Sequence, residues 1–354
     1  MTALATEKSC TTACPLGISP QGYLNLTRAG KEEEAFMHIW RHNSLPSICS
    51  RICHHPCEQA CKRGILVDEP LSIRGTKRYL TDTFADYVPP KYPKIYDKKI
   101  AVIGAGPAGL AAAHKMALQG YSVDVYDKKT RAGGMLIEGI PEFRLPKDVV
   151  AKDIERLEKA GIEFHLGEMI GKVKMEELKD SYDKIIVAAG TPNSKELKIK
   201  GWRTEGVYTA LKFMRDVNGH MDTWRAPGQQ WIEGGKYVII GGGNVALDCS
   251  RTAVRLGADE VTVICVEMGD MVPCHEWERK EAEEESVIFK EGWAPVEFLT
   301  THNKLDGVKF AKVTECTRED GKVKFTTDNA QTMELDANFV VLAIGQAAAP
   351  MWDA

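Results

Sequence analysis

A glycine-rich turn between a strand and a helix limits the folds open to this chain more than any other feature. Residues 100–103 are apolar, as expected for a buried parallel strand, and the spacing G-x-G-x-x-G follows before a helix-forming run. Glycines at this spacing allow a tight turn, close approach to a pyrophosphate and close packing of helix on strand. The first N–H groups of such a helix attract phosphates. The residues expected to contact a dinucleotide here are Gly104, Gly106, Pro107, Ala108 and Gly109.

A second strand and an acidic residue follow in the order typical of dinucleotide-binding domains. Residues 122–126 predict the strand, which leads into Asp127 and Lys128. A carboxylate at this distance accepts hydrogen bonds from ribose hydroxyls. A glycine turn without a ligand is the alternative, but the ordered set of strand, glycines, helix, strand and acid favours a dinucleotide site.

The same arrangement recurs in the second half of the chain. Residues 237–240 and 261–265 predict two strands, and the turn after the first of them has the spacing G-x-G-x-x-A. Two such units in tandem predict an α/β protein that binds two dinucleotides. The residues of the second turn expected to contact a nucleotide are Gly241, Gly243, Asn244, Val245 and Ala246.

Length and charge set broad limits on the class of protein. The chain has 354 residues, enough for two or three domains, and a net charge of −4, which gives no reason to expect a nucleic acid partner. No apolar run is long enough to cross a bilayer, and residues 1–8 lack the basic and apolar regions of a signal peptide. We therefore expect a cytoplasmic protein without a membrane span.

Six of the ten cysteines lie in the first 61 residues. They form C-x3-C-P and C-x3-C-x3-C-x3-C motifs, and Pro56 interrupts the second so that the segment must bend. Thiolates converging from a bent loop are typical ligands of an iron–sulfur cluster. Zinc is the main alternative, but its usual C-x2-C or C-x4-C pairs are absent, and His54 and His55 are expected to be flanking polar residues. The candidate metal ligands are Cys10, Cys14, Cys49, Cys53, Cys57 and Cys61.

The segments around these cysteines resemble a known family. The N-terminal iron–sulfur domain of the glutamate synthase small-subunit family is similar to residues 30–35, 43–53 and 69–75. The same domain occurs in the N-terminal module of dihydropyrimidine dehydrogenase. The resemblance implies an all-α iron–sulfur domain followed by two Rossmann-like domains, the second inserted in the first. The implied boundaries are 1–95 for the helical domain, 96–195 and 339–354 for the FAD-binding domain, and 196–338 for the NAD(H)-binding domain.

The resemblance also implies which cysteines act together. Family members usually carry two further cysteines upstream of Cys10, so one of the family's two clusters lacks ligands here, and Cys10 and Cys61 match that incomplete set. The cysteines that match three ligands of the other cluster are Cys14, Cys53 and Cys57. Lys77 lies in the segment where relatives supply a side-chain oxygen ligand. We expect one [4Fe–4S] cluster whose fourth ligand is Cys49, Cys61 or Cys10.

Three further segments resemble the flavin-contacting loop of this family and the two passages of the chain between its FAD-binding and nicotinamide-binding domains. They are residues 133–146, residues 185–191 and residues 338–346, of which the last resembles a strand that re-enters the FAD-binding domain. The chain ends before the Gly-Asp segment that closes over the flavin in relatives, so we expect a truncated form or a flavin held by fewer contacts. The residues expected to contact the flavin are Gly133, Gly134, Met135, Leu136, Ile140, Arg144, Ala189, Gly190, Thr191 and Gly345.

The residues after the strand 261–265 bear on which nicotinamide cofactor binds. Relatives that prefer NADPH carry arginines there to pair with the 2′-phosphate, whereas this chain has Val266 and Glu267. A carboxylate repels a phosphate and accepts a hydrogen bond from a free 2′-hydroxyl. The sequence therefore predicts that NAD(H) is preferred over NADP(H), and the alternative is that Glu267 only faces solvent.

The resemblance implies an electron-transfer subunit that moves electrons between NADH or NAD+, FAD and an iron–sulfur cluster, in either direction. We name no catalytic acid or base, because the cofactors carry the chemistry. The expected partner is a larger redox enzyme, such as a tungsten-dependent aldehyde oxidoreductase, or a ferredoxin-like subunit. The alternatives are a glutamate synthase small subunit, a non-catalytic NAD(H)-sensing or assembly subunit, and a flavin disulfide reductase resembling thioredoxin reductase. The last is disfavoured because the chain contains no C-x-x-C motif.

Overall fold

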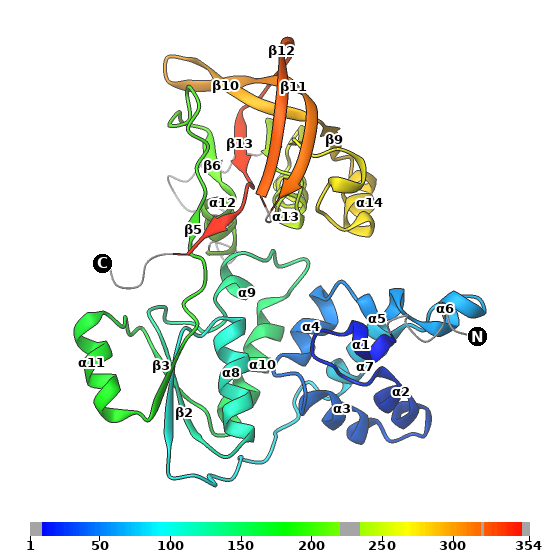
Figure 1. Ribbon diagram of the computed structural model, residues 1–354, viewed down its shortest axis with the longest axis vertical. Helices are drawn as coiled ribbons and strands as arrows, with labels where there is room; N and C mark the ends of the chain where they lie inside the picture. The colour runs from blue at the N-terminus through cyan, green and yellow to red at the C-terminus, as the bar shows by residue number, and fades with distance from the viewer. Residues whose placement is uncertain (1–8, 220–233, 320–321, 349–354) are drawn as a thin grey trace. The chain divides into compact units, whose positions relative to one another are not determined.

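The computed structural model describes residues 9–219, 234–319 and 322–348, and the chain divides after Gly190 into two compact units (Figure 1). The first unit contains a helical region and a parallel sheet, and the second contains a parallel and an antiparallel sheet. The expected order of a helical domain and two Rossmann-like domains is therefore confirmed.

Short helices build residues 10–83 of unit 1. Several of these helices begin with a proline. Proline is favourable there because the first N–H groups of a helix have no partner within the helix, so the missing N–H costs nothing. Pro56 thus begins a new helix after the bend that the sequence predicts. On α3, the side chains of Ala35, Phe36, Ile39 and Trp40 are buried. The helices are α1 (Cys10–Ala13), α2 (Pro20–Arg28), α3 (Glu32–Trp40), α4 (Pro46–Ile52), α5 (Pro56–Gln59), α6 (Lys62–Leu66) and α7 (Ile73–Thr83).

A four-stranded parallel sheet of order β3-β2-β1-β4 follows in unit 1. Both faces of β1 are covered, so its residues 100–103 are apolar and buried on both sides. Ile100 and Val102 pack toward α8 and α10, whereas Ala101 and Ile103 pack toward α11 on the opposite face (Figure 1). The elements are β1 (Lys99–Ile103), α8 (Pro107–Leu118), β2 (Ser122–Asp127), α9 (Met135–Glu138), α10 (Lys147–Lys159), β3 (Glu163–Leu166), α11 (Lys172–Ser181) and β4 (Lys184–Val187).

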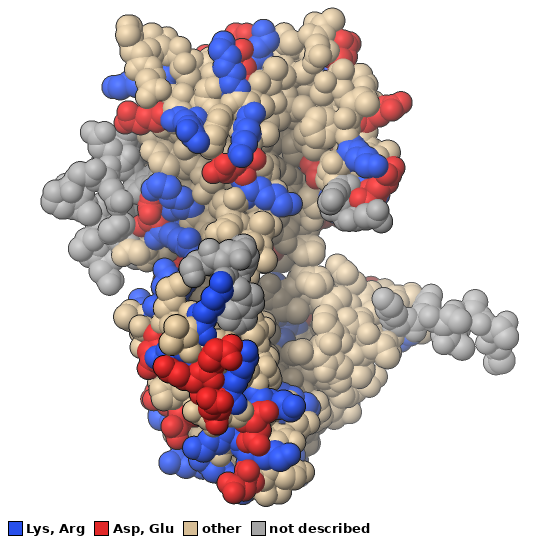
Figure 2. All heavy atoms as spheres, turned by 60° about the vertical axis from the view of Figure 1, so that its left-hand side comes forward, with Lys and Arg blue, Asp and Glu red and all other residues tan. Residues whose placement is uncertain are grey.

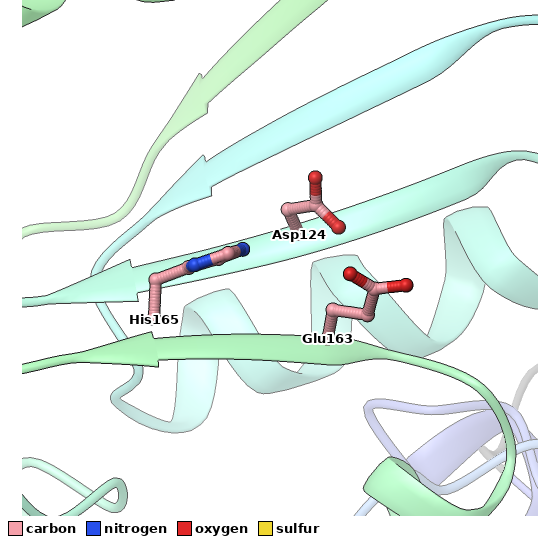
Figure 3. A group of neighbouring side chains, drawn as sticks. All are labelled: Asp124, Glu163 and His165. Carbon is pink, nitrogen blue, oxygen red and sulfur yellow. The ribbon is translucent and has the colours of Figure 1, made fainter.

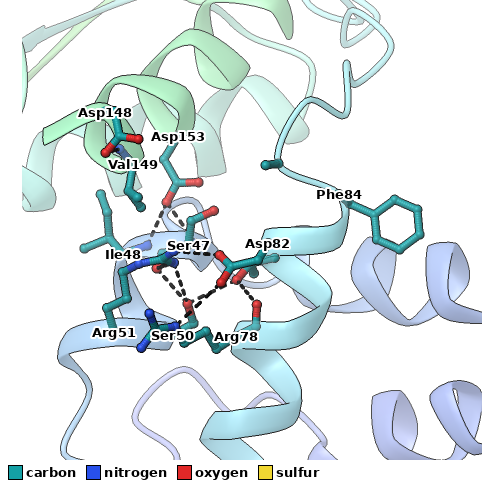
Figure 4. A network of polar contacts seen from close by, with 12 residues as sticks. Ser47, Ile48, Ser50, Arg51, Arg78, Asp82, Phe84, Asp148, Val149 and Asp153 are labelled. Carbon is teal, nitrogen blue, oxygen red and sulfur yellow. Dashed lines mark hydrogen bonds and ion pairs between the residues drawn. The ribbon is translucent and has the colours of Figure 1, made fainter. Parts of the chain in front are cut away.

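Buried polar contacts join the helical region to α10. The carboxylate of Asp153 accepts hydrogen bonds from the backbone N–H groups of Ser47 (3.0 Å) and Ile48 (3.1 Å) at the start of α4 (Figure 4). Asp153 also pairs with Arg156 at 2.5 Å, and Arg156 donates to the carbonyl of Ala85 at 2.9 Å. Asp153 is fully buried, so these bonds fix α4, which carries Cys49, to the nucleotide-binding half of the unit.

The second unit has a five-stranded parallel sheet of order β6-β13-β7-β8-β9. Helices cover one face, and the antiparallel sheet β10-β11-β12 covers the other. The sequence did not indicate this antiparallel sheet. The elements are β5 (Asn193–Ser194), β6 (Val207–Thr209), α12 (Ala210–Gly219), β7 (Lys236–Ile240), α13 (Asn244–Arg255), β8 (Glu260–Cys265), η1 (Gly269–Met271), α14 (Glu276–Glu284), β9 (Ile288–Glu291), β10 (Trp293–Thr301), β11 (Lys304–Glu319), β12 (Lys322–Asp336), β13 (Phe339–Leu342) and β14 (Gln346–Ala347).

One strand lies in a different sheet from the one that the sequence predicts. We expected the strand beginning at residue 339 to re-enter the FAD-binding domain, but β13 is hydrogen-bonded between β6 and β7 in unit 2. Its residues 339–342 are all buried, and the parallel pairing of Phe339 with Tyr237 places them beside β7, the central strand of that sheet. Residues 349–354 of the predicted segment lie outside the described residues.

The face of the molecule drawn in Figure 2 carries charges of both signs. Over the face drawn in Figure 2, the described basic and acidic side chains are interspersed. This face therefore has no large area of one charge.

Candidate nucleotide and iron–sulfur sites

The first glycine turn has the geometry that its spacing predicts. Gly104 has φ +110°, and a Cβ there would lie 2.3 Å from the carbonyl oxygen of Ala188. A Cβ on Gly109 would lie 1.8 Å from the carbonyl oxygen of Gly104. By contrast, a Cβ on Gly106 would meet no atom within 4 Å, and no side chain caps the helix that begins at Pro107. Two glycines are thus required for packing, while Gly106 leaves open space beside unpaired N–H groups that suit a phosphate.

The second glycine pair of unit 1 lies against this turn. A Cβ on Gly134 (φ +54°) would lie 3.0 Å from the Cα of Gly106. The N–H of Gly133 donates to the carbonyl of Ala105 at 2.8 Å. The structure thus brings together two segments that the sequence connected only through the family resemblance.

Asp127 supports the glycine turn directly. One of its carboxylate oxygens accepts from the N–H of Ala105 (2.8 Å), and the other accepts from the N–H of Lys129 (2.9 Å). We expected this carboxylate to accept from ribose hydroxyls. Because a carboxylate can accept about four hydrogen bonds, these two contacts leave it able to bind a ribose as well.

The remaining residues expected to contact a flavin differ in exposure. Leu136 is buried in the core of unit 1, so only its backbone can face a ligand. The carbonyl of Ile140 accepts a hydrogen bond from Lys147 Nζ at 2.5 Å. Met135 and Arg144 are half-buried. Of the residues in this unit that the sequence analysis expects to contact the dinucleotide, the exposed ones are Pro107, Ala108, Lys128, Ala189 and Gly190.

The second glycine turn repeats the first in unit 2. A Cβ on Gly241 (φ +136°) would lie 2.4 Å from the carbonyl oxygen of Ala343, and a Cβ on Gly243 would meet nothing within 4 Å. Ala246 is fully buried at the position equivalent to Gly109, and Val245 is exposed. Asn244 accepts a hydrogen bond from the N–H of His275 at 3.0 Å and so fixes the segment beyond β8. This turn, too, offers open space at the N-terminus of a long helix.

Thr191 and Gly345, which the sequence analysis expects to contact the flavin, lie beside the paired strands β5 and β14. Lys195 donates its N–H to the carbonyl of Gly345 at 3.0 Å, and the hydroxyl of Thr191 donates to Gln346 at 3.3 Å. Gly345 has φ +100°, a conformation that glycine adopts without strain. Both Thr191 and Gly345 are exposed.

Glu267 lies in a more shielded position than the sequence suggests. Its side chain is 11% exposed, and its nearest cation is Arg318 on β11, with a distance of 3.5 Å from Nη2 to Oε1. The alternative that Glu267 only faces solvent does not fit this burial. Sequence reasoning missed Arg318, because no local motif connects residue 318 with a turn 51 residues earlier.

The predicted metal ligands are gathered in the helical region. Cys10, Cys14 and Cys57 pack beside the same apolar side chains around Tyr23. Burial and then the charge of Cys53 raise the pKa of Cys57 to about 11, and Cys14 contributes in the same direction. Cys14 and Cys53 therefore lie near enough to Cys57 to affect its charge.

The other cysteines have separate surroundings. Cys49 is held by a contact from its thiol to Asn43 Oδ1 at 3.6 Å. Burial raises the pKa of Cys49, while the ammonium group of Lys77 lowers it. Lys77 acts on Cys57 in the same way. Burial also opposes ionisation of Cys61, but backbone hydrogen bonds from Leu71, Gly64 and Arg63 hold its pKa below the usual value.

The spacing of the thiols also bears on zinc. A tetrahedral zinc ion holds its thiolates about 3.8 Å apart, given Zn–S bonds of about 2.3 Å. Among the residues that the structure describes, no three cysteine sulfurs lie within 4.8 Å of one another. No three of these sulfurs are therefore as close together as a bound zinc ion would hold its thiolates.

A further polar group lies on the first sheet, and the sequence analysis did not identify it. Ligand atoms of Asp124 on β2 and of Glu163 and His165 on β3 lie within 4.8 Å of one another (Figure 3). Tyr182 donates to Asp124 at 2.5 Å, and Tyr126 stacks on His165 at 4.5 Å. We assign no ligand to this group, because exposed acidic groups are common without an ion.

Comparison with known proteins agrees with this geometry. Residues 98–352 match the family model described as pyridine nucleotide-disulphide oxidoreductase, and residues 4–88 match dihydropyrimidine dehydrogenase domain II, 4Fe-4S cluster. None of the helices in the described ranges combines the length and apolar character needed to cross a bilayer.

Two curated relatives and one solved structure illustrate the similarity. The chain is 34% identical to an NADP(+)-dependent formate dehydrogenase subunit beta from Moorella thermoacetica, covering 96% of this chain and 51% of that protein. It is 33% identical to a glutamate synthase [NADPH] small chain from Azospirillum brasilense, and the match covers 86% of this chain and 65% of that protein. FprA from Mycobacterium tuberculosis shares the fold, with a TM-score of 0.61, 19% identity and 72% coverage of both chains.

These relatives are longer than this chain, which spans about half of the first and 65% of the second. The two family models together cover both the nucleotide-binding units and the cysteine-rich helices. The chain belongs to the pyridine nucleotide-disulphide oxidoreductase family and carries an N-terminal 4Fe–4S domain of the dihydropyrimidine dehydrogenase type.

Proposed function

We propose that this chain is an NADH-linked electron-transfer subunit that holds FAD in its first unit, NAD(H) in its second and one [4Fe–4S] cluster among its N-terminal cysteines. The observation that carries the proposal is the repeated glycine turn. Gly106 and Gly243 each leave open space at the uncapped start of a 12-residue helix. Such a helix start, with its partial positive charge, suits the pyrophosphate of a dinucleotide.

The chain's own residues would bind and orient the cofactors. When bound, FAD exchanges a hydride with nicotinamide and single electrons with an iron–sulfur cluster. Gly134 and Gly106 allow the backbone to approach a flat ring and a phosphate. Cys14, Cys53 and Cys57 would supply three thiolates, with Cys49, Cys61 or Cys10 as the fourth. The ammonium group of Lys77 would offset part of their negative charge.

The proposed preference for NADH rests on Glu267. Its carboxylate follows β8, where it would accept from a free 2′-hydroxyl and repel a 2′-phosphate. The names of the relatives refer to NADP+ or NADPH, so this preference is a departure from them.

The proposed partner is a larger redox enzyme or a ferredoxin-like subunit. Support comes from the relatives, which are named as subunits of formate dehydrogenase and glutamate synthase. A tungsten-dependent aldehyde oxidoreductase is our preferred partner. Mass spectrometry of the chains that co-purify with this protein tests this choice, and a glutamate synthase large chain among them would contradict it.

The visible spectrum of the purified full chain tests the cofactor assignment. Flavin bands that bleach with NADH, above a broad iron–sulfur absorbance, are the expected result. A colourless protein that still binds NADH would point to a sensing or assembly subunit. A reducible flavin without iron would point to a simple flavin reductase.

A further inference from the structure

Arg318 reaches the predicted nucleotide site of unit 2 from a distant part of the chain. β11, one of the long strands in Figure 1, belongs to the antiparallel sheet that covers the second parallel sheet. Arg318 lies near its end and pairs with Glu267, two residues beyond β8. The side chain of Arg318 is 46% exposed and that of Glu267 is 11% exposed. The arginine therefore presents the accessible side of this ion pair.

The neighbouring charges are held more firmly than Arg318. Arg279 pairs with Glu291 at 2.5 Å and with Glu283 at 2.9 Å, and it lies over the ring of Phe289. Glu291 also accepts from the N–H of Gly269 at 2.7 Å. These contacts fix Arg279 and neutralise Glu291.

The contact between Arg318 and Glu267 is weak by comparison. At 3.5 Å it lies at the limit of hydrogen-bond distance, where the attraction is small. An ion pair with one solvent-exposed partner contributes little to stability, because water screens the attraction. The guanidinium group can therefore leave Glu267 for a stronger partner at little cost.

We propose that Arg318 is a specificity-determining residue that binds the 2′-phosphate of NADP(H). The guanidinium group would turn from Glu267 to the phosphate, where bidentate hydrogen bonds to a dianion are stronger than its present contact. With NAD(H), which lacks this phosphate, Arg318 would stay on Glu267. The pair Glu267–Arg318 thus permits both cofactors, and Glu267 sets the preference for NADH. The inference rests on the proposed nucleotide site in unit 2.

Arg318→Gln on the full chain tests this role. Calorimetric dissociation constants are measured for NADH, NADPH, AMP and 2′-phospho-AMP. The expected result is a loss of about tenfold or more in affinity for NADPH and 2′-phospho-AMP, with less than about threefold change for NADH and AMP. The affinity for NADPH should also become less sensitive to salt, because one screened charge pair is lost.

Lys309→Gln is the matched control. Lys309 lies on the same strand and has an ion pair of the same length, 3.5 Å, with Glu334. Removing this charge should leave all four dissociation constants unchanged. Equal weakening of NADH and NADPH in Arg318→Gln, or no change in either, would overturn the role of Arg318 while leaving the nucleotide site intact. Failure of the unmodified chain to bind either dinucleotide would overturn the proposed function together with this inference.

Discussion

The carboxylate of Asp153 on α10 accepts a hydrogen bond from the backbone N–H of Ser47 at 3.0 Å, across 106 residues of sequence. Asp153 is fully buried and also pairs with the buried Arg156. It therefore supplies the acceptor that the first turn of α4 lacks, since no side chain of α4 itself caps the helix. Cys49, which follows on α4, depends on this contact for its position.

Asp153→Ala should lower the free energy of unfolding by about 3–5 kcal/mol, because it leaves Arg156 buried without its charged partner. Urea denaturation followed by circular dichroism measures this change. The matched control is Asp86→Ala, which removes an exposed ion pair with Lys152 on the same helix and should cost about 0–1 kcal/mol. Equal effects of the two substitutions would contradict the role of the buried pair.

Gly106→Ala and Gly109→Ala should have different effects although they lie three residues apart. A Cβ at position 109 would collide with the carbonyl of Gly104, so Gly109→Ala should destabilise the first unit by about 2 kcal/mol or more. Gly106→Ala meets no protein atom, so the fold should persist while the FAD content falls. Thermal unfolding and the ratio of flavin to protein separate the two outcomes. A Gly106→Ala protein that keeps its full flavin content would argue against a pyrophosphate at this turn.

Cys53→Ser and Cys61→Ser test the grouping of the cysteines. We expect Cys53→Ser to lose most of its iron and sulfide, because Cys53 interacts with both Cys57 and Cys49. Cys61→Ser should retain the cluster, because Cys61 matches the incomplete ligand set in the family resemblance. Iron and acid-labile sulfide analysis measures both. Loss of the cluster in Cys61→Ser would assign the fourth ligand to that residue.

Glu267→Arg should shift the preference toward NADPH. It replaces a carboxylate that repels the 2′-phosphate with a second guanidinium group beside Arg318, and the two can share one dianion. We expect the ratio of the dissociation constants for NADH and NADPH to change by about tenfold or more, which corresponds to about 1.4 kcal/mol. An unchanged ratio would remove Glu267 from the specificity site.

His114 should make the stability of the first unit depend on pH. Burial lowers the pKa of His114 from 6.5 to about 4, and its Nε2 atom is 2.8 Å from the hydroxyl of Tyr92. Between these two pH values the unfolded chain binds a proton that the folded chain does not, so stability falls as the pH falls. The full loss is about 3 kcal/mol.

His114→Gln removes this titrating group and keeps a polar partner for Tyr92. Its free energy of unfolding, measured from pH 7 to pH 4, should decline less steeply than that of the unmodified protein. Parallel curves for the two proteins would show that His114 does not titrate as its burial implies.

The sequence alone predicted the elements whose causes are local. The G-x-G-x-x-G turn was predictable because Gly109 packs against the carbonyl of Gly104 in the same motif and Gly106 lies at the start of the helix. The break at Pro56 was predictable because proline lacks the backbone N–H that a helix interior needs, which is also a local cause. The family resemblance added the grouping of cysteines, which spacing alone left open.

Tertiary structure decided the contacts between residues far apart in sequence. Asp153 supports Ser47 across 106 residues, and Arg318 reaches Glu267 across 51. β13 joins the second sheet because its four apolar residues require buried partners on both sides, and β6 and β7 provide them. Apolar periodicity indicates that a strand is buried but does not specify which sheet buries it. Only folding brings such partners together, so only the structure could identify them.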